Sequence, residues 1–148
     1  MSKERNTWIF QANPKLYDIH EALRVEAKDM WGCVQHIKRI KAGDRALIWI
    51  SGSEAGIYAV ANILSDPELR EDSAIGLKYW TNPVRGASPR PRVWIQFEKV
   101  LLDNPLLKRY LQWDPELWNL SIFANPRGTN FKVTQSEWEA IENWLEEA

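Results

Sequence analysis

The sequence predicts an α+β protein in which helices surround a small curled sheet or barrel. Its 148 residues are 45% hydrophobic and 26% charged, which suits one soluble domain with a substantial core. Strand-like and helical runs follow in the order strand, helix, two strands, long loop, strand, helix, strand, helix. Because this order is irregular, it favours a mixed sheet over a doubly wound parallel one. We expect a single domain over residues 1–148.

The first elements are a strand and a helix. Residues 7–11 form an apolar run with high β-propensity, which ends at Pro14 because proline disfavours helical conformation in the residue before it. Apolar residues then recur at helical spacing and predict a helix over about residues 16–27. A glycine and a basic stretch follow over residues 31–41, where no regular element is predicted.

Three strands and a long loop are predicted in the middle of the chain. Residues 45–50 and 57–64 are rich in Ile, Val and Ala and flank a Gly- and Ser-rich turn, which predicts a β-hairpin. Residues 71–92 contain several prolines and predict a long loop with a short strand at 77–80. Loops of this length are usually functional or disordered. Alternating apolar residues over 93–100 predict the next strand.

Helix start signals dominate the last third. Asn-Pro at 104–105 and Asp-Pro at 114–115 each combine a preferred N-cap with proline at the first helical position, and they predict two short helices. After a strand at 131–133, Thr-Gln-Ser-Glu at 134–137 is a capping box that opens an amphipathic final helix. Five glutamates of this helix are expected to form a solvated face: Glu137, Glu139, Glu142, Glu146 and Glu147.

The composition excludes several classes of protein. No stretch approaches the roughly 20 apolar residues of a membrane span, and the polar N-terminus lacks a secretion signal. We therefore expect a cytoplasmic protein without membrane contact. Cys33 is the only cysteine, so no internal disulfide is expected. The histidines have no metal-binding spacing and no glycine-rich phosphate motif is present, so neither metal nor cofactor is expected.

Catalysis has one weak candidate in the sequence. Cys33 and His36 lie three residues apart, and an imidazole can activate a thiol. A lone cysteine is more commonly a small buried hydrophobe. We therefore predict no catalytic residue and no enzyme activity.

Charge is unevenly distributed although its sum is only −1. Two basic clusters stand out, one over residues 36–45 and one over residues 78–92, and the second contains aromatic residues. Basic side chains interleaved with aromatics can follow a phosphate backbone while stacking a base. Ordinary surface lysines and arginines give the same pattern, so the residues alone leave both interpretations open.

Nine tryptophans are unusual in a chain of this length. Six are expected to pack within helices, strands and loops: Trp8, Trp94, Trp113, Trp118, Trp138 and Trp144. Three lie in loops or at strand ends, where binding sites are often built, and core packing and ligand binding both stay open for them: Trp31, Trp49 and Trp80.

Ordered sequence blocks resemble the EVE domain family over about residues 7–145. The blocks are FQANP at 10–14, WGCV at 31–34, AGDR at 42–45, WISG at 49–52, AGIYAVA at 55–61 and GTNFKVT at 128–134. The resemblance implies a PUA-like fold, a small curled β-barrel with helices packed on it that is related to the YTH and ASCH domains. It also implies a non-catalytic reader that binds a flipped-out methylated or hydroxymethylated base.

The resemblance further implies DNA with a 5-methylcytosine-type base as the favoured partner, with modified RNA second. A stand-alone copy would be a monomer that relies on a separate nuclease or other effector. The family pattern places the base pocket at six residues: Asn13, Trp31, Gly32, Trp49, Ser51 and Trp80. Flanking phosphates would meet five basic residues: Lys38, Arg39, Arg85, Arg90 and Arg127.

The sequence departs from the family in two places. Gln35-His36 stand where many EVE domains have Arg-Asn, and Asn13 replaces the usual Glu.

Three alternatives remain beside the reader of modified DNA. The first is a reader of N6-methyladenine or other modified RNA, or of a free nucleobase-like molecule. The second is an ASCH-like hydrolase of modified nucleosides, which would need a buried lysine with a carboxylate and a threonine; Lys78 is the candidate. The third is a protein-interaction adaptor with exposed tryptophans.

Overall fold

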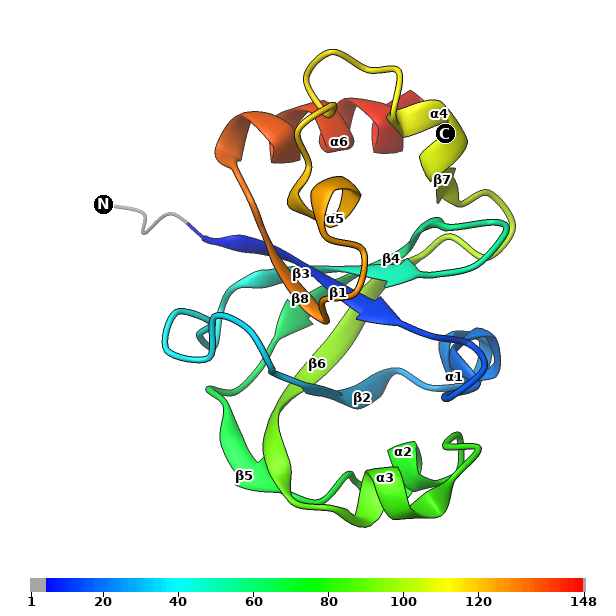
Figure 1. Cartoon of the computed structure of the whole chain (residues 1–148), viewed down its shortest axis with the longest axis vertical. Coiled ribbons are helices and arrows are strands. Elements are labelled where there is room, and N and C mark those ends of the chain that lie inside the picture. Colours follow the sequence, from blue (N-terminus) through cyan, green and yellow to red (C-terminus); the bar gives the residue numbers. More distant parts are fainter. Residues whose placement is uncertain (1–4, 148) are drawn as a thin grey trace.

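The computed structural model describes residues 5–147, and a curled mixed sheet forms its centre (Figure 1). The main strands lie in the order β2-β6-β4-β3-β1-β8, while β5 pairs with β6 and β7 with β4. Only β1 and β3 run parallel, and all other pairs are antiparallel. Irregular registers at Ile48/Trp49 and Val60/Ala61 interrupt the ladders, and such bulges increase strand curl. The α+β class with a small curled sheet is confirmed.

The strands are short except in the centre of the sheet. Their bounds are β1 Thr7–Ala12, β2 Lys28–Gly32, β3 Arg45–Ile50, β4 Gly56–Ile63, β5 Glu68–Arg70, β6 Arg90–Val100, β7 Leu106–Leu107 and β8 Asn130–Val133. The helices are α1 Ile19–Val25, α2 Ala74–Leu77, α3 Pro83–Ala87, α4 Lys108–Leu111, α5 Ser121–Ala124 and α6 Gln135–Glu147. Among residues 5–147, no helix has the length and apolarity needed to cross a bilayer.

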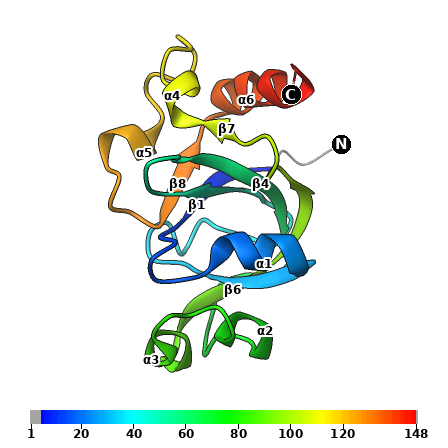
Figure 2. The same cartoon turned by 90° about the vertical axis from the view of Figure 1, so that its right-hand side faces the viewer.

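Both faces of the sheet are buried because helices and loops cover each one. Along β1, Trp8 and Phe10 belong to one core cluster, whereas Ile9 between them belongs to the other. In Figure 2, α6 and α4 lie at one end of the molecule, and α2 and α3 lie at the other. Side chains alternate across a strand, so β1, β3 and β4 each contribute to two separate cores.

The first strand, the central hairpin and the final helix follow the sequence prediction. The capping box is present: Thr134 Oγ1 accepts from Glu137 N at 3.2 Å, and the Glu137 carboxylate accepts from Thr134 N at 2.9 Å. This role buries Glu137 at 8% exposure, so its assignment to the solvated face was wrong. The other four glutamates of α6 are exposed.

Several local predictions were wrong. The first helix is shorter than expected because the Asp18 side chain caps it at Glu21 N and the chain then enters β2, which was not predicted. The expected strand at 77–80 is replaced by α2, α3 and a single bridge between Tyr17 and Trp80. The predicted helix after Asn104 begins as β7, because it pairs with β4.

The Asp-Pro signal at 114–115 gives turns instead of a helix. Trp113 and Trp118 on either side are 74% and 59% exposed, so the expectation that they pack loops was wrong. By contrast, Trp8 and Trp138 are buried as expected.

Candidate functional site

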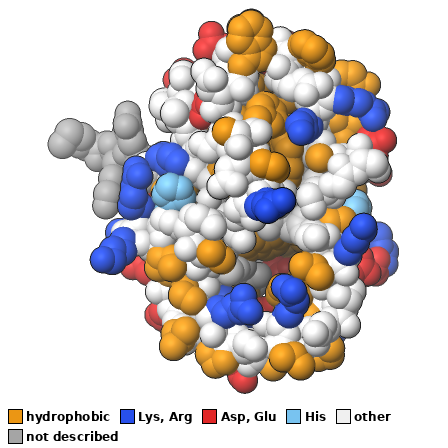
Figure 3. Space-filling model, viewed as in Figure 1, with side chains coloured by type: hydrophobic (Ala, Val, Ile, Leu, Met, Phe, Trp, Pro, Cys, Tyr) orange, Lys and Arg blue, Asp and Glu red, His pale blue; other side chains and the backbone are white. Residues whose placement is uncertain are grey.

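A cavity of about 790 Å³ opens on one side of the sheet, within the size range of small-ligand pockets. Its walls come from the end of β1, from β2, and from segments over residues 33–37, 72–92 and 126–129. Figure 3 shows the hollow in the lower half of the molecule, with hydrophobic side chains inside it and blue Lys or Arg side chains around its mouth. The long loop at 71–92, which was predicted to be functional or disordered, therefore meets the segments at 33–37 and 126–129 at one place.

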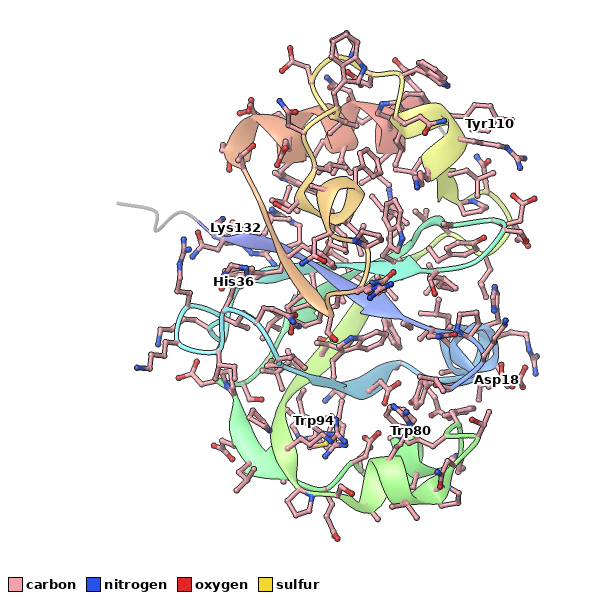
Figure 4. All side chains as sticks on the ribbon, in the orientation of Figure 1. Asp18, His36, Trp80, Trp94, Tyr110 and Lys132 are labelled. Carbon is pink, nitrogen blue, oxygen red and sulfur yellow. The ribbon has the colours of Figure 1, made fainter. Side chains whose placement is uncertain are left out.

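Aromatic side chains form much of the cavity wall. Trp31 on β2 is 7% exposed, and Phe10 stacks beneath it with ring centroids 6.3 Å apart. Tyr17 meets Trp31 edge-on at 6.5 Å and Trp80 edge-on at 4.9 Å. Figure 4 shows Trp80 between the α2–α3 pair and β2. Flat aromatic faces around an open space suit a planar ligand.

Trp80 is fixed by packing and by a hydrogen bond. Its Nε1 donates to Asp72 Oδ2 at 2.7 Å. Gly86 lies so close that an added Cβ would meet Trp80 Cδ1 at 2.6 Å. Glycine at position 86 leaves the space that this orientation of the indole needs, since a larger residue would displace the ring.

Tyr17 is held by a buried carboxylate behind the cavity. Its hydroxyl donates to Asp29 Oδ2 at 2.6 Å, and Met30 N donates to Asp29 Oδ1 at 2.8 Å. Burial raises the pKa of Asp29 from 3.8 to about 7, and burial with the nearby Asp29 charge also raises the pKa of Tyr17. No sequence motif marked Tyr17 as a pocket residue, because its spacing placed it only in the predicted first helix.

Side-chain amides connect the loops on the other side of the cavity. Asn130 Oδ1 accepts from Val34 N at 2.7 Å, and its Nδ2 donates to Gly32 O at 3.1 Å. Gln35 Oε1 accepts from the backbone of Thr129 and Asn130, both at 2.9 Å. Gln35, one of the departures from the family pattern, thus ties the segment after β2 to β8.

Arg92 anchors the segment below the cavity. It is 3% exposed, and its guanidinium donates to three carbonyls: Arg70 O, Ser88 O and Arg85 O. The rigid fork of arginine suits several fixed acceptors. Arg92 therefore holds both ends of the stretch that carries Trp80.

Five of the six predicted pocket residues line the cavity: Asn13, Trp31, Gly32, Ser51 and Trp80. The prediction for Trp49 was wrong. Its neighbours Ile48 and Ile50 face the core cluster that contains Trp31, so alternation along β3 turns Trp49 to the opposite core. There it is 3% exposed and meets Phe123 at 6.0 Å.

The predicted phosphate-binding residues fall into two groups. Arg85, Arg90 and Arg127 line the cavity and are exposed, and within residues 5–147 none of them forms an ion pair. Lys38 and Arg39 do not line the cavity.

Arg39 instead belongs to a second basic group around Trp8. The Arg39 guanidinium lies 5.9 Å from the Trp8 ring, the Lys132 ammonium 5.2 Å, and the His36 ring 5.1 Å. His36 and Lys132 lie close together in Figure 4, away from Trp80.

The candidate catalytic groups have unsuitable surroundings. Cys33 lines the cavity but is 2% exposed, and burial raises the pKa of its thiol to about 12. Lys78 lies outside the cavity lining, where its ammonium is 3.5 Å from the Glu26 carboxylate. No lysine is among the described residues that line the cavity. Residues 5–147 also contain no group of three side chains suited to a metal ion.

Several solved structures share this fold. A hypothetical protein from Leishmania major is 19% identical with a TM-score of 0.73, and the match covers 99% of this chain and 98% of that one. Human THYN1, in complex with DNA containing 5-methylcytosine, is 19% identical with a TM-score of 0.70, covering 97% and 98%. The YTH domain of Zygosaccharomyces rouxii MRB1, in complex with N6-methyladenosine RNA, is 13% identical with a TM-score of 0.56, covering 95% and 83%.

The curled mixed sheet with its helices is thus a PUA-like fold. A search of curated proteins found no match to the sequence. The EVE domain family model matches residues 6–144, and the chain belongs to this family.

Proposed function

We propose that this protein is a non-catalytic reader that captures a flipped-out modified base, of the 5-methylcytosine type in DNA. The observation that carries the proposal is the cavity, whose aromatic wall of Tyr17, Trp31 and Trp80 lies beside arginines that form no ion pair within residues 5–147. Human THYN1 has been solved with DNA containing 5-methylcytosine, and a YTH domain with N6-methyladenosine RNA. These relatives support a modified base as the ligand.

The energetics of such capture are balanced. Drawing a base from a duplex costs a few kcal/mol. Stacking on aromatic side chains returns about 1–3 kcal/mol per base, and a buried methyl group adds roughly 1 kcal/mol. Because these costs and gains nearly cancel, the free energy contributed by the methyl group can decide whether the base stays in the pocket.

The arginines at the cavity mouth would hold phosphates beside the captured base. Arg85 and Arg90 approach from the α3–β6 side and Arg127 from the loop before β8. Contacts to phosphate fix register without reading sequence. Burial of Cys33 and the position of Lys78 outside the cavity favour binding over hydrolysis.

The test is titration of short oligonucleotides that carry cytosine, 5-methylcytosine, 5-hydroxymethylcytosine or N6-methyladenine, each as DNA and as RNA. We expect about fivefold tighter binding of 5-methylcytosine DNA than of cytosine DNA, since stacking is common to both bases and the roughly 1 kcal/mol from the methyl group corresponds to that ratio. Trp31→Ala should remove this preference because it deletes one aromatic wall.

Two further variants make the result specific. Trp80→Ala removes a wall residue that is only partly buried, so it serves if Trp31→Ala does not fold. Trp113→Ala is the matched control, because Trp113 is 74% exposed and outside the cavity lining. Equal binding of all bases, or a preference that persists in both wall variants, contradicts the proposal. A preference for N6-methyladenine RNA would instead identify an RNA reader.

A further inference from the structure

Asp72 is the only acidic residue among the described residues that line the cavity, and sequence analysis did not select it. It is 7% exposed and lies just before α2, with its carboxylate packed so closely on Gly76 that an added Cβ would meet Oδ1 at 2.2 Å. Figure 3 shows acidic side-chain atoms, coloured red, inside the hollow. An ionisable group is thus presented to a mostly apolar cavity, and burial raises its pKa.

The hydrogen bonds of Asp72 leave part of its accepting capacity unused. Oδ2 accepts from Trp80 Nε1 and Oδ1 from Ser73 N, each at 2.7 Å. An ionised carboxylate has about four acceptor sites, so roughly two remain. The nearby Arg92 guanidinium is directed at backbone carbonyls and makes no ion pair with Asp72. What the carboxylate lacks is therefore a further donor, and the cavity is where a ligand can supply one.

Among bases of similar shape, an acceptor-only group discriminates by the exocyclic substituent. Cytosine presents an amino group at N4, which donates to carboxylates, whereas thymine presents the acceptor O4 at the same position. Thymine and 5-methylcytosine share the methyl group and ring size. A carboxylate therefore attracts the amino group of 5-methylcytosine and repels O4 of thymine, although both bases stack equally well.

We propose that Asp72 accepts a hydrogen bond from the exocyclic amino group of the captured base and so makes the pocket select 5-methylcytosine over thymine. This inference rests on the proposed function and adds the residue that reads the base edge. Trp80 takes part indirectly, since its Nε1 orients the carboxylate while its ring lines the same cavity.

The test compares single-stranded DNA that carries either 5-methylcytosine or thymine at one position, so that no base pair has to be opened. Binding is measured near pH 8, because burial raises the pKa of Asp72 above its ordinary 3.8 and a higher pH favours the ionised carboxylate. We expect the wild type to bind 5-methylcytosine at least tenfold more tightly than thymine. Asp72→Asn should reduce this ratio to about threefold or less, because its amide can donate to O4.

Glu71→Gln is the matched control, since it removes the same charge from an exposed neighbour outside the cavity lining and should keep the wild-type ratio. If Asp72→Asn does not fold, the wild type is tested with N4-dimethylated 5-methylcytosine, which lacks the amino hydrogens and should bind at least tenfold more weakly. An unchanged ratio in a folded Asp72→Asn variant overturns this inference alone, while Trp31-dependent reading of the methyl mark stands. Wild-type protein that binds 5-methylcytosine and thymine equally overturns this inference, and wild-type protein that also binds cytosine equally overturns both proposals.

Discussion

Two buried carboxyl groups hold the aromatic wall, Asp29 from behind the cavity and Asp72 from within its lining. Asp29 accepts from the Tyr17 hydroxyl and Asp72 from the Trp80 indole, so each carboxylate orients one wall residue. Burial raises the pKa of both groups. Buried carboxylates destabilise a fold when they are charged, and their presence here suits a pocket whose side chains must keep fixed orientations.

Asp29 should make stability depend on pH. Its pKa rises from 3.8 unfolded to about 7 folded, so between these values the folded state holds a proton that the unfolded state has released. Stability therefore falls as pH rises through this window and levels off above it. The shift corresponds to roughly 4 kcal/mol at most, at 1.36 kcal/mol per pKa unit. Urea unfolding from about pH 4 to about pH 8 measures this change.

The variant Asp29→Asn should lose most of this pH dependence, whatever its absolute stability. Asp66→Asn is the control, because Asp66 is an exposed aspartate that accepts from Ala42 N and should keep the wild-type slope. The same slope in wild type and Asp29→Asn would show that Asp29 titrates at its ordinary pKa.

At the scale of elements, the segment from β5 to β6 depends on tertiary contacts for its order. Its helices α2 and α3 have four and five residues, too few to be stable alone in water. Ser73 and Asn82 cap them by accepting from Gly76 N and Val84 N. Arg92 then joins the two ends of the segment through backbone carbonyls.

Arg92→Lys should loosen this segment without unfolding the sheet, because an ammonium cannot reach three separate carbonyls in the same geometry. Loss of charge-assisted hydrogen bonds lowers the free energy of local opening by about 2 kcal/mol. This change corresponds to roughly 30-fold faster amide exchange. Hydrogen exchange should show this increase in α2 and α3, while β1 and β3 stay protected.

Arg70→Lys tests whether any arginine in the segment has this effect. Arg70 pairs with Glu68 at the surface, and exposed pairs contribute little, so exchange in α2 and α3 should stay as in the wild type. Uniform acceleration throughout the sheet in Arg92→Lys would instead indicate a global role for Arg92.

At the scale of the whole molecule, the cavity arginines and the exposed glutamates of α6 lie on different sides of the sheet. Arg85, Arg90 and Arg127 surround the cavity, whereas the exposed glutamates of α6 lie beyond the opposite side of the sheet (Figure 1). The net charge of −1 hides this separation. Nucleic acid should therefore approach by the cavity, because its arginines attract phosphate and the glutamates of α6 repel it.

Binding should weaken with salt in proportion to the number of phosphate contacts. Arg127→Gln removes one cation at the cavity mouth and should reduce the slope of log K against log salt by about 0.7 for a single strand or about 0.9 for duplex DNA. Arg109→Gln is the matched control, since Arg109 pairs with Glu54 and lies outside the cavity lining. Equal slopes in the two variants would exclude phosphate contact by Arg127.

Local chemistry in the sequence determined the elements whose signals are self-contained. The apolar run of β1, the hairpin of β3 and β4, and the capping box of α6 depend on neighbouring residues, and all three were predicted. The resemblance to the EVE family also named five residues that line the cavity, including Trp31 and Trp80.

Only the tertiary structure decided which face each side chain presents and which distant groups meet. Trp49 turns away from the cavity because its strand serves two cores. The Asp72 carboxylate is oriented in the cavity lining by a hydrogen bond from Trp80, eight residues later, and no local sequence pattern encodes that contact. Sequence fixes propensity over a few residues, whereas a pocket is built from segments far apart in the chain, and their packing selects the residues that line it.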